Sequence, residues 1–370
     1  MVLFLSLSRS SKRKRRMFNC IQVEITSRCF LKCVMCPGPA LADKWVARDM
    51  DPGVVDKVVE SAELANLIYL SGWGEPLLYP GLPELVKRIR TSGAETGFTT
   101  NGVLLDRRRA QELVEAGLDL MSISIAGATR ETHGSVRVGS DLGQIIDNVK
   151  ALVALKKRLR TDEPRIVVLY LMLKQNISEL PAAVDLAHEL GVDELVATNM
   201  TYAPTPAQDR MRVFSCGRPE GHGARYAAFV EEARARAGEL GLKFRAYPLT
   251  MEEVAVCDED PLHNVFITAD GQVGPCVYLN MMLKGPIPRV FCGKALEVER
   301  VGFGSLGDGD LTDIWEGEDY VSFRQVFAER LLAVQEPLFL GPTAPGEIYE
   351  RLKSCPLPSA CRTCYKAYGL

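Results

Sequence analysis

Three cysteines within eight residues constrain what this chain can fold into more than any other feature. Cys29, Cys33 and Cys36 have the spacing C-x3-C-x2-C, and eleven cysteines scattered over 370 residues would produce about 0.01 such occurrences by chance. Cysteine thiolates bind iron–sulfur clusters, and three of them can hold one face of a four-iron cube while the fourth iron stays open. Two alternatives are buried core cysteines and half of a zinc site built on Cys33 and Cys36.

The chain from Cys20 to Met200 alternates short apolar runs with longer amphipathic stretches, which is typical of parallel βαβ units. Asp51 and Pro52 begin one expected helix, and Gly117 and Gly191 end two others. Six repeats predict an α/β fold with a partial (β/α)6 barrel of the TIM type. The strand-like runs are Cys20–Thr26, Leu67–Ser71, Glu95–Thr100, Leu118–Ile125, Arg165–Leu173 and Glu194–Asn199.

Polar or glycine-rich groups follow each strand-like run. In barrels of this type the C-terminal ends of the strands carry the chemistry, so we expect one site on one face. Glycines allow a backbone to approach a ligand closely, and the Glu75 carboxylate can pair with an ammonium group, although a tight turn with a surface glutamate is the alternative. The groups are the three cysteines, Gly72–Pro76, Thr99–Gly102, Ser122 with Ser124, Lys174–Asn176, and Thr198 with Asn199.

A second group of cysteines lies in the last third of the chain. Cys257 and Cys276 lie on either side of Asp270 and Gly271, which predict a hairpin turn that returns Cys276 toward Cys257. Further along, Cys361 and Cys364 have the spacing of a metal knuckle, for which zinc is the alternative to iron–sulfur. Cys355 precedes that pair.

Three other cysteines fit no spacing pattern. Cys20 and Cys216 are expected to be ordinary core or loop residues. Cys292 is either a further metal ligand or a bystander.

Composition excludes several classes of protein. A net charge of −3 gives no sign of nucleic-acid binding. The basic run at 11–16 follows an apolar piece at 2–5 that is too short to span a membrane and lies in the wrong order for a signal peptide. We therefore expect a disordered leader at 1–17, no membrane segment, and a cytoplasmic protein whose thiols are reduced or bind metal.

The first cysteine motif, with the lead-in Val23–Thr26, resembles that of the radical S-adenosylmethionine (SAM) enzymes. Met35 stands where that family often has an aromatic residue, beside the cluster rather than on it. The resemblance implies a [4Fe–4S] cluster on the three cysteines, with SAM as its ligand. It also implies SAM contacts for Gly72, Gly74, Glu75, Thr99, Thr100, Asn101, Ser124 and Arg137, the last of which is otherwise a solvated arginine.

The C-terminal cysteines resemble the SPASM or shorter twitch extensions of that family, which bind auxiliary iron–sulfur clusters. We expect one auxiliary [4Fe–4S] cluster on Cys257, Cys276, Cys361 and Cys364. A second cluster that uses Cys355 and Cys292 is an alternative, although a full SPASM set has more cysteines and position 352 is Leu352. The expected domains are the barrel at 18–205, a linker and helix that complete it at 206–250, and a small SPASM/twitch-like domain at 251–370.

The resemblance implies a radical SAM oxidoreductase or maturase, in which SAM is cleaved to a 5′-deoxyadenosyl radical that abstracts hydrogen. Such an enzyme needs a reductant such as ferredoxin or flavodoxin. Peptide or protein modification is the first expectation for the substrate, although no leader-peptide-binding domain precedes the first strand. Dehydrogenation or rearrangement of a small molecule, in sugar or cofactor biosynthesis, is the alternative. A non-enzymatic electron carrier is a third possibility, but it would not need the groups at the strand ends.

No catalytic acid or base can be assigned from the sequence. The chain has four histidines, His133, His188, His222 and His263, and His188 lies within a helical pattern. The acidic run at 258–260 is most simply a solvated charge cluster.

Overall fold

The structure is a computed structural model that describes residues 16–216, 222–340 and 345–370. The leader expected at 1–17 falls almost entirely on residues outside these ranges. Within the described ranges, no helix has the length and apolar character needed to cross a membrane.

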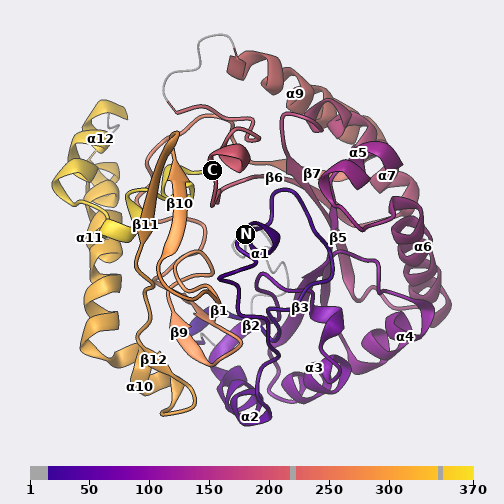
Figure 1. The fold of residues 1–370 in the computed structure, drawn as a ribbon, viewed down its shortest axis with the longest axis horizontal. Coiled ribbons are helices and arrows are strands. Elements are labelled where there is room, and N and C mark those ends of the chain that lie inside the picture. Colours follow the sequence, from indigo (N-terminus) through magenta and orange to yellow (C-terminus); the bar gives the residue numbers. More distant parts are fainter. Residues whose placement is uncertain (1–15, 217–221, 341–344) are drawn as a thin grey trace.

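Seven parallel strands form one curved sheet, in which the order of the strands follows the sequence (Figure 1). Six of them correspond to the predicted runs: two have the predicted bounds, and the ends of the other four differ from prediction by at most three residues. The first strand ends early because Thr26 leaves it and forms an antiparallel bridge with Asp49. The strands are β1 (Phe18–Val23), β2 (Ala65–Tyr69), β3 (Glu95–Thr100), β4 (Leu120–Ile125), β5 (Arg165–Met172), β6 (Glu194–Asn199) and β7 (Lys243–Ala246).

Helices cover the outer face of this sheet, as expected for a partial barrel (Figure 1). The Asp106 carboxylate accepts the N–H of Arg109 at the start of α4, at 2.8 Å. Gly117 and Gly191 end α4 and α7 in left-handed conformations, with φ of 84° and 69°, as predicted. The covering helices are α2 (Pro52–Ser61), α3 (Leu82–Arg90), α4 (Arg107–Ala116), α6 (Leu142–Leu159), α7 (Leu180–Leu190) and α9 (His222–Leu240).

Shorter helices lie in the connections after the strands. They are α1 (Pro37–Ala40), α5 (Arg130–Val136) and α8 (Pro206–Asp209). The central strands are buried on both faces, and every residue of β4 is buried, as expected for a parallel sheet covered by helices. Burial of apolar side chains on both faces supplies the main stabilisation of the barrel.

The last third of the chain extends the same sheet. Strand β8 (Asn264–Ile267) pairs in parallel with β1, on the side away from β2. Strand β9 (Gln272–Gly274) turns back against β8 through Gly271, whose φ is 83°, so the predicted hairpin is present. Strand β12 (Gly304–Ser305) pairs with β9 and completes a ten-stranded sheet.

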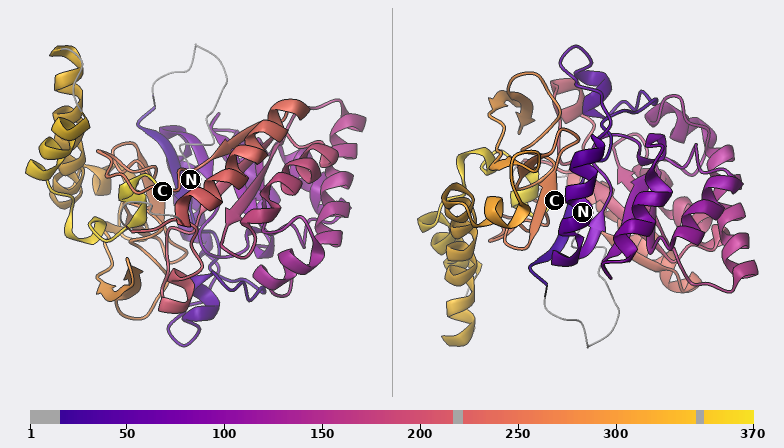
Figure 2. Two further views of the ribbon diagram at one scale, coloured as in Figure 1. Left: turned by 90° about the horizontal axis from the view of Figure 1, so that it is seen from above. Right: turned by 90° about the horizontal axis from the view of Figure 1, so that it is seen from below.

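The remaining C-terminal elements lie beside this edge. Strands β10 (Ile287–Phe291) and β11 (Lys294–Val298) form a separate hairpin. Helix α10 (Leu311–Glu316) is followed by α11 (Glu318–Leu340) and α12 (Pro345–Ser354). Figure 2 shows α11 and α12 at the far edge of the molecule, away from the barrel helices.

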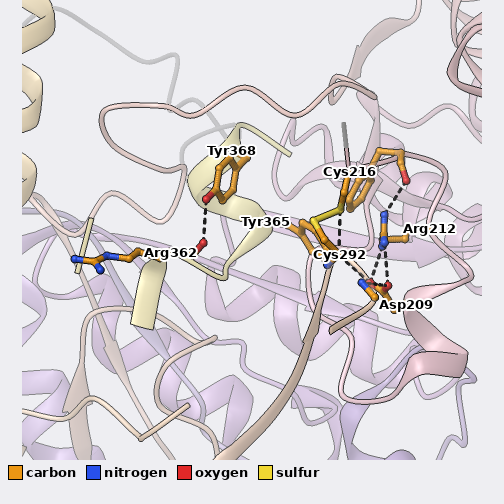
Figure 3. The surroundings of a disulfide bond; sticks show 9 residues. Asp209, Arg212, Cys216, Cys292, Arg362, Tyr365 and Tyr368 are labelled. Carbon is orange, nitrogen blue, oxygen red and sulfur yellow. Dashed lines mark hydrogen bonds and ion pairs between the residues drawn. A yellow bond between two sulfur atoms is a disulfide. The ribbon is translucent and has the colours of Figure 1, made fainter. Parts of the chain in front are cut away.

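Cys216 and Cys292 form a disulfide bond (Figure 3). It ties the connection between α8 and α9 to the turn of the β10–β11 hairpin. The expectations that Cys216 is an ordinary core or loop residue and that the thiols are reduced or bind metal are therefore wrong for this pair. The use of Cys292 in a second cluster is also wrong here, because a sulfur bonded to another sulfur is not a thiolate ligand. The Tyr365 hydroxyl braces the same turn, since it accepts the N–H of Cys292 at 2.8 Å and donates to Asp209 at 2.8 Å.

Candidate active site

The first cysteine motif forms a loop that leaves the end of β1. The N–H of Lys32 donates to the Val138 carbonyl at 2.9 Å, and the N–H of Val34 donates to the Val136 carbonyl at 3.0 Å. These bonds hold the loop against the segment that follows α5. Arg137 lies in that segment and is therefore beside the cysteines.

The thiols of this loop are close enough to affect one another. Burial, and then the charges of Cys33 and Cys29, raise the pKa of Cys36 to about 12, and Arg137 opposes the rise. Burial also raises the pKa of Cys29. Three thiolates at this place are therefore unfavourable unless positive charge accompanies them, and the irons of a cluster supply that charge.

Gln208 of α8 supports the cysteine loop, although it lies 174 residues after Val34 in the sequence. Its side-chain amide donates to the carbonyls of Val34 at 3.0 Å and Cys36 at 3.2 Å. The Thr205 hydroxyl accepts the N–H of Gln208 and so caps this short helix. No sequence pattern indicates this contact, because the composition of the region is that of a linker.

The glycine-rich segment after β2 packs against the exit of β1. The N–H of Glu75 donates to the Arg28 carbonyl at 2.8 Å. A Cβ atom at Gly74 would overlap the carbonyl oxygens of Thr26 and Arg28, and one at Gly72 would overlap the Glu24 side chain. Only glycine fits at these two positions.

The Glu75 carboxylate is buried and receives donors from two neighbouring strand ends. It accepts the Thr100 hydroxyl at 2.6 Å, the N–H of Asn101 at 2.8 Å and the N–H of Leu77 at 3.1 Å. Burial raises the pKa of Glu75, and these hydrogen bonds and Arg137 oppose the rise. A carboxylate has about four lone-pair sites, so Glu75 retains capacity for one more donor.

One cavity of about 270 Å³ opens at the C-terminal ends of the strands. Three residues that line it each carry a buried polar atom with no hydrogen-bond partner among the described residues, namely Asn101 Nδ2, Arg137 Nε and Asn199 Oδ1. Every residue predicted to bind the first cluster or SAM lines this cavity: Cys29, Cys33, Cys36, Gly72, Gly74, Glu75, Thr99, Thr100, Asn101, Ser124 and Arg137.

Ser122 and the predicted group at 174–176 do not line the cavity. Ser122 accepts a hydrogen bond from the Tyr69 hydroxyl at 3.3 Å, and Asn176 bonds the backbone of Leu173, Ala126 and Leu171. The cavity is completed instead by residues of β5, the β6 exit and the segment after Cys276, which the sequence did not single out. These include Leu169, Leu171, Met200, Thr201, Tyr202, Val277 and Tyr278.

Four C-terminal thiols lie together. Burial, and then the charge of Cys364, raise the pKa of Cys257 to about 12. Burial raises the pKa of Cys276 and Cys361 well above the usual range, and Cys257 and Cys364 add to both shifts. Cys355 does not contribute to the raised pKa of any of these three thiols, and it lies just after α12.

Neither thiol set has the geometry of a single-ion site. Within the described part of the chain, no three His, Cys, Asp or Glu side chains converge closely enough to hold one metal ion. A zinc ion would draw its thiolates to about 2.3 Å from one point, whereas a cube spreads them over separate irons.

The described histidines do not line the cavity. Burial lowers the pKa of His133 to about 4, and its Nε2 lies 3.0 Å from the Ser140 hydroxyl. His263 pairs with Asp260 at 3.0 Å. His188 is exposed on α7.

Two family models match the chain. The model for the Radical SAM superfamily matches residues 23–187, and the SPASM model, for an iron–sulfur cluster-binding domain, matches residues 257–337.

Relatives with sequence similarity act on different substrates. A tungsten-containing aldehyde ferredoxin oxidoreductase cofactor-modifying protein from Pyrococcus furiosus is 29% identical over 308 residues, which are 82% of each chain. A PqqA peptide cyclase from Gluconobacter oxydans is 30% identical over 181 residues, so the match spans about half (48%) of each chain.

A solved structure shares the fold. Streptococcus suis SuiB bound to the precursor peptide SuiA has a TM-score of 0.58 and 14% identity, over 95% of this chain and 70% of that one.

Proposed function

Because the chain belongs to the radical SAM superfamily and carries a C-terminal SPASM domain, we propose that it abstracts hydrogen from an uncharged part of a peptide. The observation that carries the proposal is the single cavity that joins the three-cysteine loop to a neutral, largely apolar pocket. When bound, the cluster supplies the electron that cleaves SAM to methionine and a 5′-deoxyadenosyl radical. The chain's own residues bind the reactants, orient them and exclude water.

The first half of the proposed site holds the cluster and SAM. Cys29, Cys33 and Cys36 bind three irons and leave the fourth open. Glu75 has a free acceptor position for the methionine ammonium group. Arg137 lines the cavity with no ion pair among the described residues, which suits it to the methionine carboxylate. Thr99, Thr100, Asn101 and Ser124 complete this half as ribose or carboxylate contacts.

The second half of the cavity favours a neutral substrate. Apart from the thiols, the charged residues on the whole cavity wall are Glu75 and Arg137, both in the SAM half. The tyrosine hydroxyls of the second half already have protein partners: Tyr202 donates to the Pro288 carbonyl at 2.6 Å, and Tyr278 pairs with Thr201 at 3.1 Å. The rings and aliphatic chains therefore form the contact surface. A substrate with several phosphates would lack cations there.

One polar atom in this half is free to select the substrate. The Asn199 amide nitrogen donates to the Pro248 carbonyl at 2.7 Å. A carbonyl only accepts, so Oδ1 must face the other way. This oxygen is buried, has no hydrogen-bond partner within the described part of the chain, and belongs to a residue on the cavity wall. It suits an N–H or O–H donor on the substrate, such as a peptide N–H.

Two substrate classes remain, and a relative supports each. The PqqA peptide cyclase and the peptide-bound SuiB favour a peptide. The cofactor-modifying relative, which aligns over more of the chain, favours a cofactor-like small molecule. We place the peptide first because its side chains and amides match the neutral wall and the free acceptor.

The proposal includes an electron donor and a domain division. Cys29 is the most exposed of the three cluster thiols, which gives a reductant such as ferredoxin or flavodoxin a route to the cluster in the cytoplasm. The proposed division remains a barrel at 18–205, its completion at 206–250 and the auxiliary-cluster domain at 251–370.

The test is SAM cleavage by anaerobically reconstituted protein under dithionite. We expect 5′-deoxyadenosine and methionine in equal amounts, and no 5′-deoxyadenosine from C33A. A peptide encoded beside this gene should then lose the mass of a hydrogen molecule or become crosslinked. Cleavage by a C33A protein that lacks the first cluster would overturn the assignment, and modification of a small molecule instead would select the second substrate class.

A further inference from the structure

The C-terminal part of the molecule contains a buried cation with an unusual set of partners. Arg289 of β10 is 3% exposed. Its guanidinium donates to the carbonyls of Ala360 at 2.8 Å, Thr363 at 3.4 Å and Tyr278 at 3.2 Å. All three partners are neutral.

Those carbonyls belong to the backbone that carries the thiols. Ala360 directly precedes Cys361, Thr363 directly precedes Cys364, and Tyr278 is two residues after Cys276. Arg289 therefore holds together two segments that are far apart in the sequence and that supply three of the four thiols.

The charge of Arg289 is not balanced by a carboxylate, unlike that of its buried neighbours. Arg330 pairs with Glu253 at 2.7 Å, and Lys366 pairs with Asp258 at 3.3 Å. Among the described residues Arg289 has no ion pair, and its Nε has no hydrogen-bond partner. A buried charge without a counter-charge is strongly unfavourable.

The nearby groups that can carry a compensating negative charge are the thiols and the buried Glu259. Cys361 and Cys364 directly follow the two residues, Ala360 and Thr363, whose carbonyls accept from the Arg289 guanidinium. Glu259 is also buried here, and after burial its charge is a cause of the raised pKa of Cys276. Four thiolates carry more negative charge than the core of a [4Fe–4S] cluster neutralises, and reduction adds one more electron.

We propose that Arg289 is the counter-charge of the auxiliary iron–sulfur cluster and that it raises the reduction potential of that cluster. The inference rests on the proposed ligands Cys257, Cys276, Cys361 and Cys364. A fixed cation beside the cluster favours the reduced, more negative state. Arg289 thereby makes the auxiliary cluster a better electron acceptor.

The test is the midpoint potential of the auxiliary cluster in the full-length chain. The background is C29A/C33A/C36A, so that the auxiliary cluster alone gives a signal in a redox titration followed by electron paramagnetic resonance. R289Q keeps a hydrogen-bond donor and removes the charge, whereas R289K keeps the charge. R300M is the control, because Arg300 bonds the side chain of Asn280 at 2.7 Å and not a backbone carbonyl beside a thiol.

We expect R289Q to lower the equilibrium constant for reduction at least tenfold, which is about 59 mV for one electron. R289K and R300M should stay close to the parent protein. Thermal unfolding gives a second measure. R289Q should lower the unfolding midpoint of the iron-loaded chain. It should not lower the midpoint of the chelator-stripped chain, because the unpaired charge of Arg289 destabilises that form.

An unchanged potential in R289Q, or an equal loss of stability with and without iron, would show a structural role alone and overturn the inference. The failure of the ligand proposal looks different. In that case the C29A/C33A/C36A chain would contain no iron at all.

Discussion

Glu24 accepts a hydrogen bond from the backbone N–H of Trp73, at 2.8 Å, and so connects the end of β1 to the glycine-rich segment after β2. The indole N–H of Trp73 donates in turn to the Val277 carbonyl at 3.1 Å. Val277 follows Cys276 directly. The exit of the first strand, the proposed SAM segment and the backbone beside the proposed auxiliary cluster therefore meet at Trp73.

The burial of Glu24 predicts a pH-dependent stability. Burial raises the pKa of Glu24 to about 7, although the Trp73 N–H opposes the rise. A carboxyl group whose pKa is raised on folding stabilises the fold when protonated, and this contribution is lost as the pH rises toward 7. The complete loss of this contribution lowers the free energy of unfolding by an amount on the order of 3 kcal/mol.

The measurement is thermal unfolding of the iron-free chain at about pH 5 and about pH 8, for the wild type and E24Q. Glutamine keeps an oxygen for the Trp73 N–H but does not titrate. The wild type should lose more stability between the two pH values than E24Q does. Parallel changes in both proteins would mean that Glu24 is ionised at both pH values.

Substitution of Gly74 should separate SAM binding from cluster binding. In G74A the new Cβ overlaps the Thr26 and Arg28 carbonyls, so the glycine-rich segment must move away from β1. We expect the first cluster to assemble, because its thiols lie on another loop, and the affinity for SAM to fall by roughly tenfold or more. The matched control is G53A, since nothing lies within 4 Å of a Cβ at Gly53 on α2.

The measurements for Gly74 are iron content and SAM binding by equilibrium dialysis. Normal SAM affinity in G74A would contradict the proposed role of the segment. Loss of both iron and SAM binding in G74A would show that the glycine-rich segment and the cysteine loop form one unit.

Arg137 predicts a specific loss of SAM affinity. R137M removes the cation proposed to meet the methionine carboxylate, and a hydrogen bond to a charged group is worth roughly tenfold to hundredfold in affinity. R107M, on the exposed surface of α4, is the control. The dissociation constant of SAM is measured for both. An unchanged constant in R137M would leave Arg137 as a partner of the cluster thiols alone.

The alternation of strands and helices predicted the barrel, because period and capping signals are local. Gly117 marks the end of α4 in both sequence and structure, and the hairpin at Gly271 follows from Asp270 and Gly271 themselves. The pairing of β8 with β1 could not be predicted in this way. It joins segments some 240 residues apart, such as Cys20 and Asn264, and no local pattern records it.

The candidate site likewise has one part that local sequence patterns predict and another part that they do not. The cysteine spacing and the polar strand ends are sequence patterns, and they lie along one cavity, although their ligand roles stay predictions. Gln208 and Arg289 have no such pattern. Each acts through long-range hydrogen bonds to backbone carbonyls, and the disulfide partner of Cys216 lies 76 residues away.

The auxiliary ligand set predicts which cysteines change the iron content. A [4Fe–4S] cluster contributes about four irons, so the reconstituted wild type should contain about eight. C364S should lose about four irons. The charge of Cys364 contributes to the raised pKa of both Cys257 and Cys276, so Cys364 lies with these ligands and the cluster needs it. C355S should keep the full amount, and so should C292S, whose sulfur is bonded to Cys216 in the wild type.

The measurements are iron and sulfide analysis on anaerobic protein. About twelve irons in the wild type with a loss of about four in C355S would instead place Cys355 in a second auxiliary cluster.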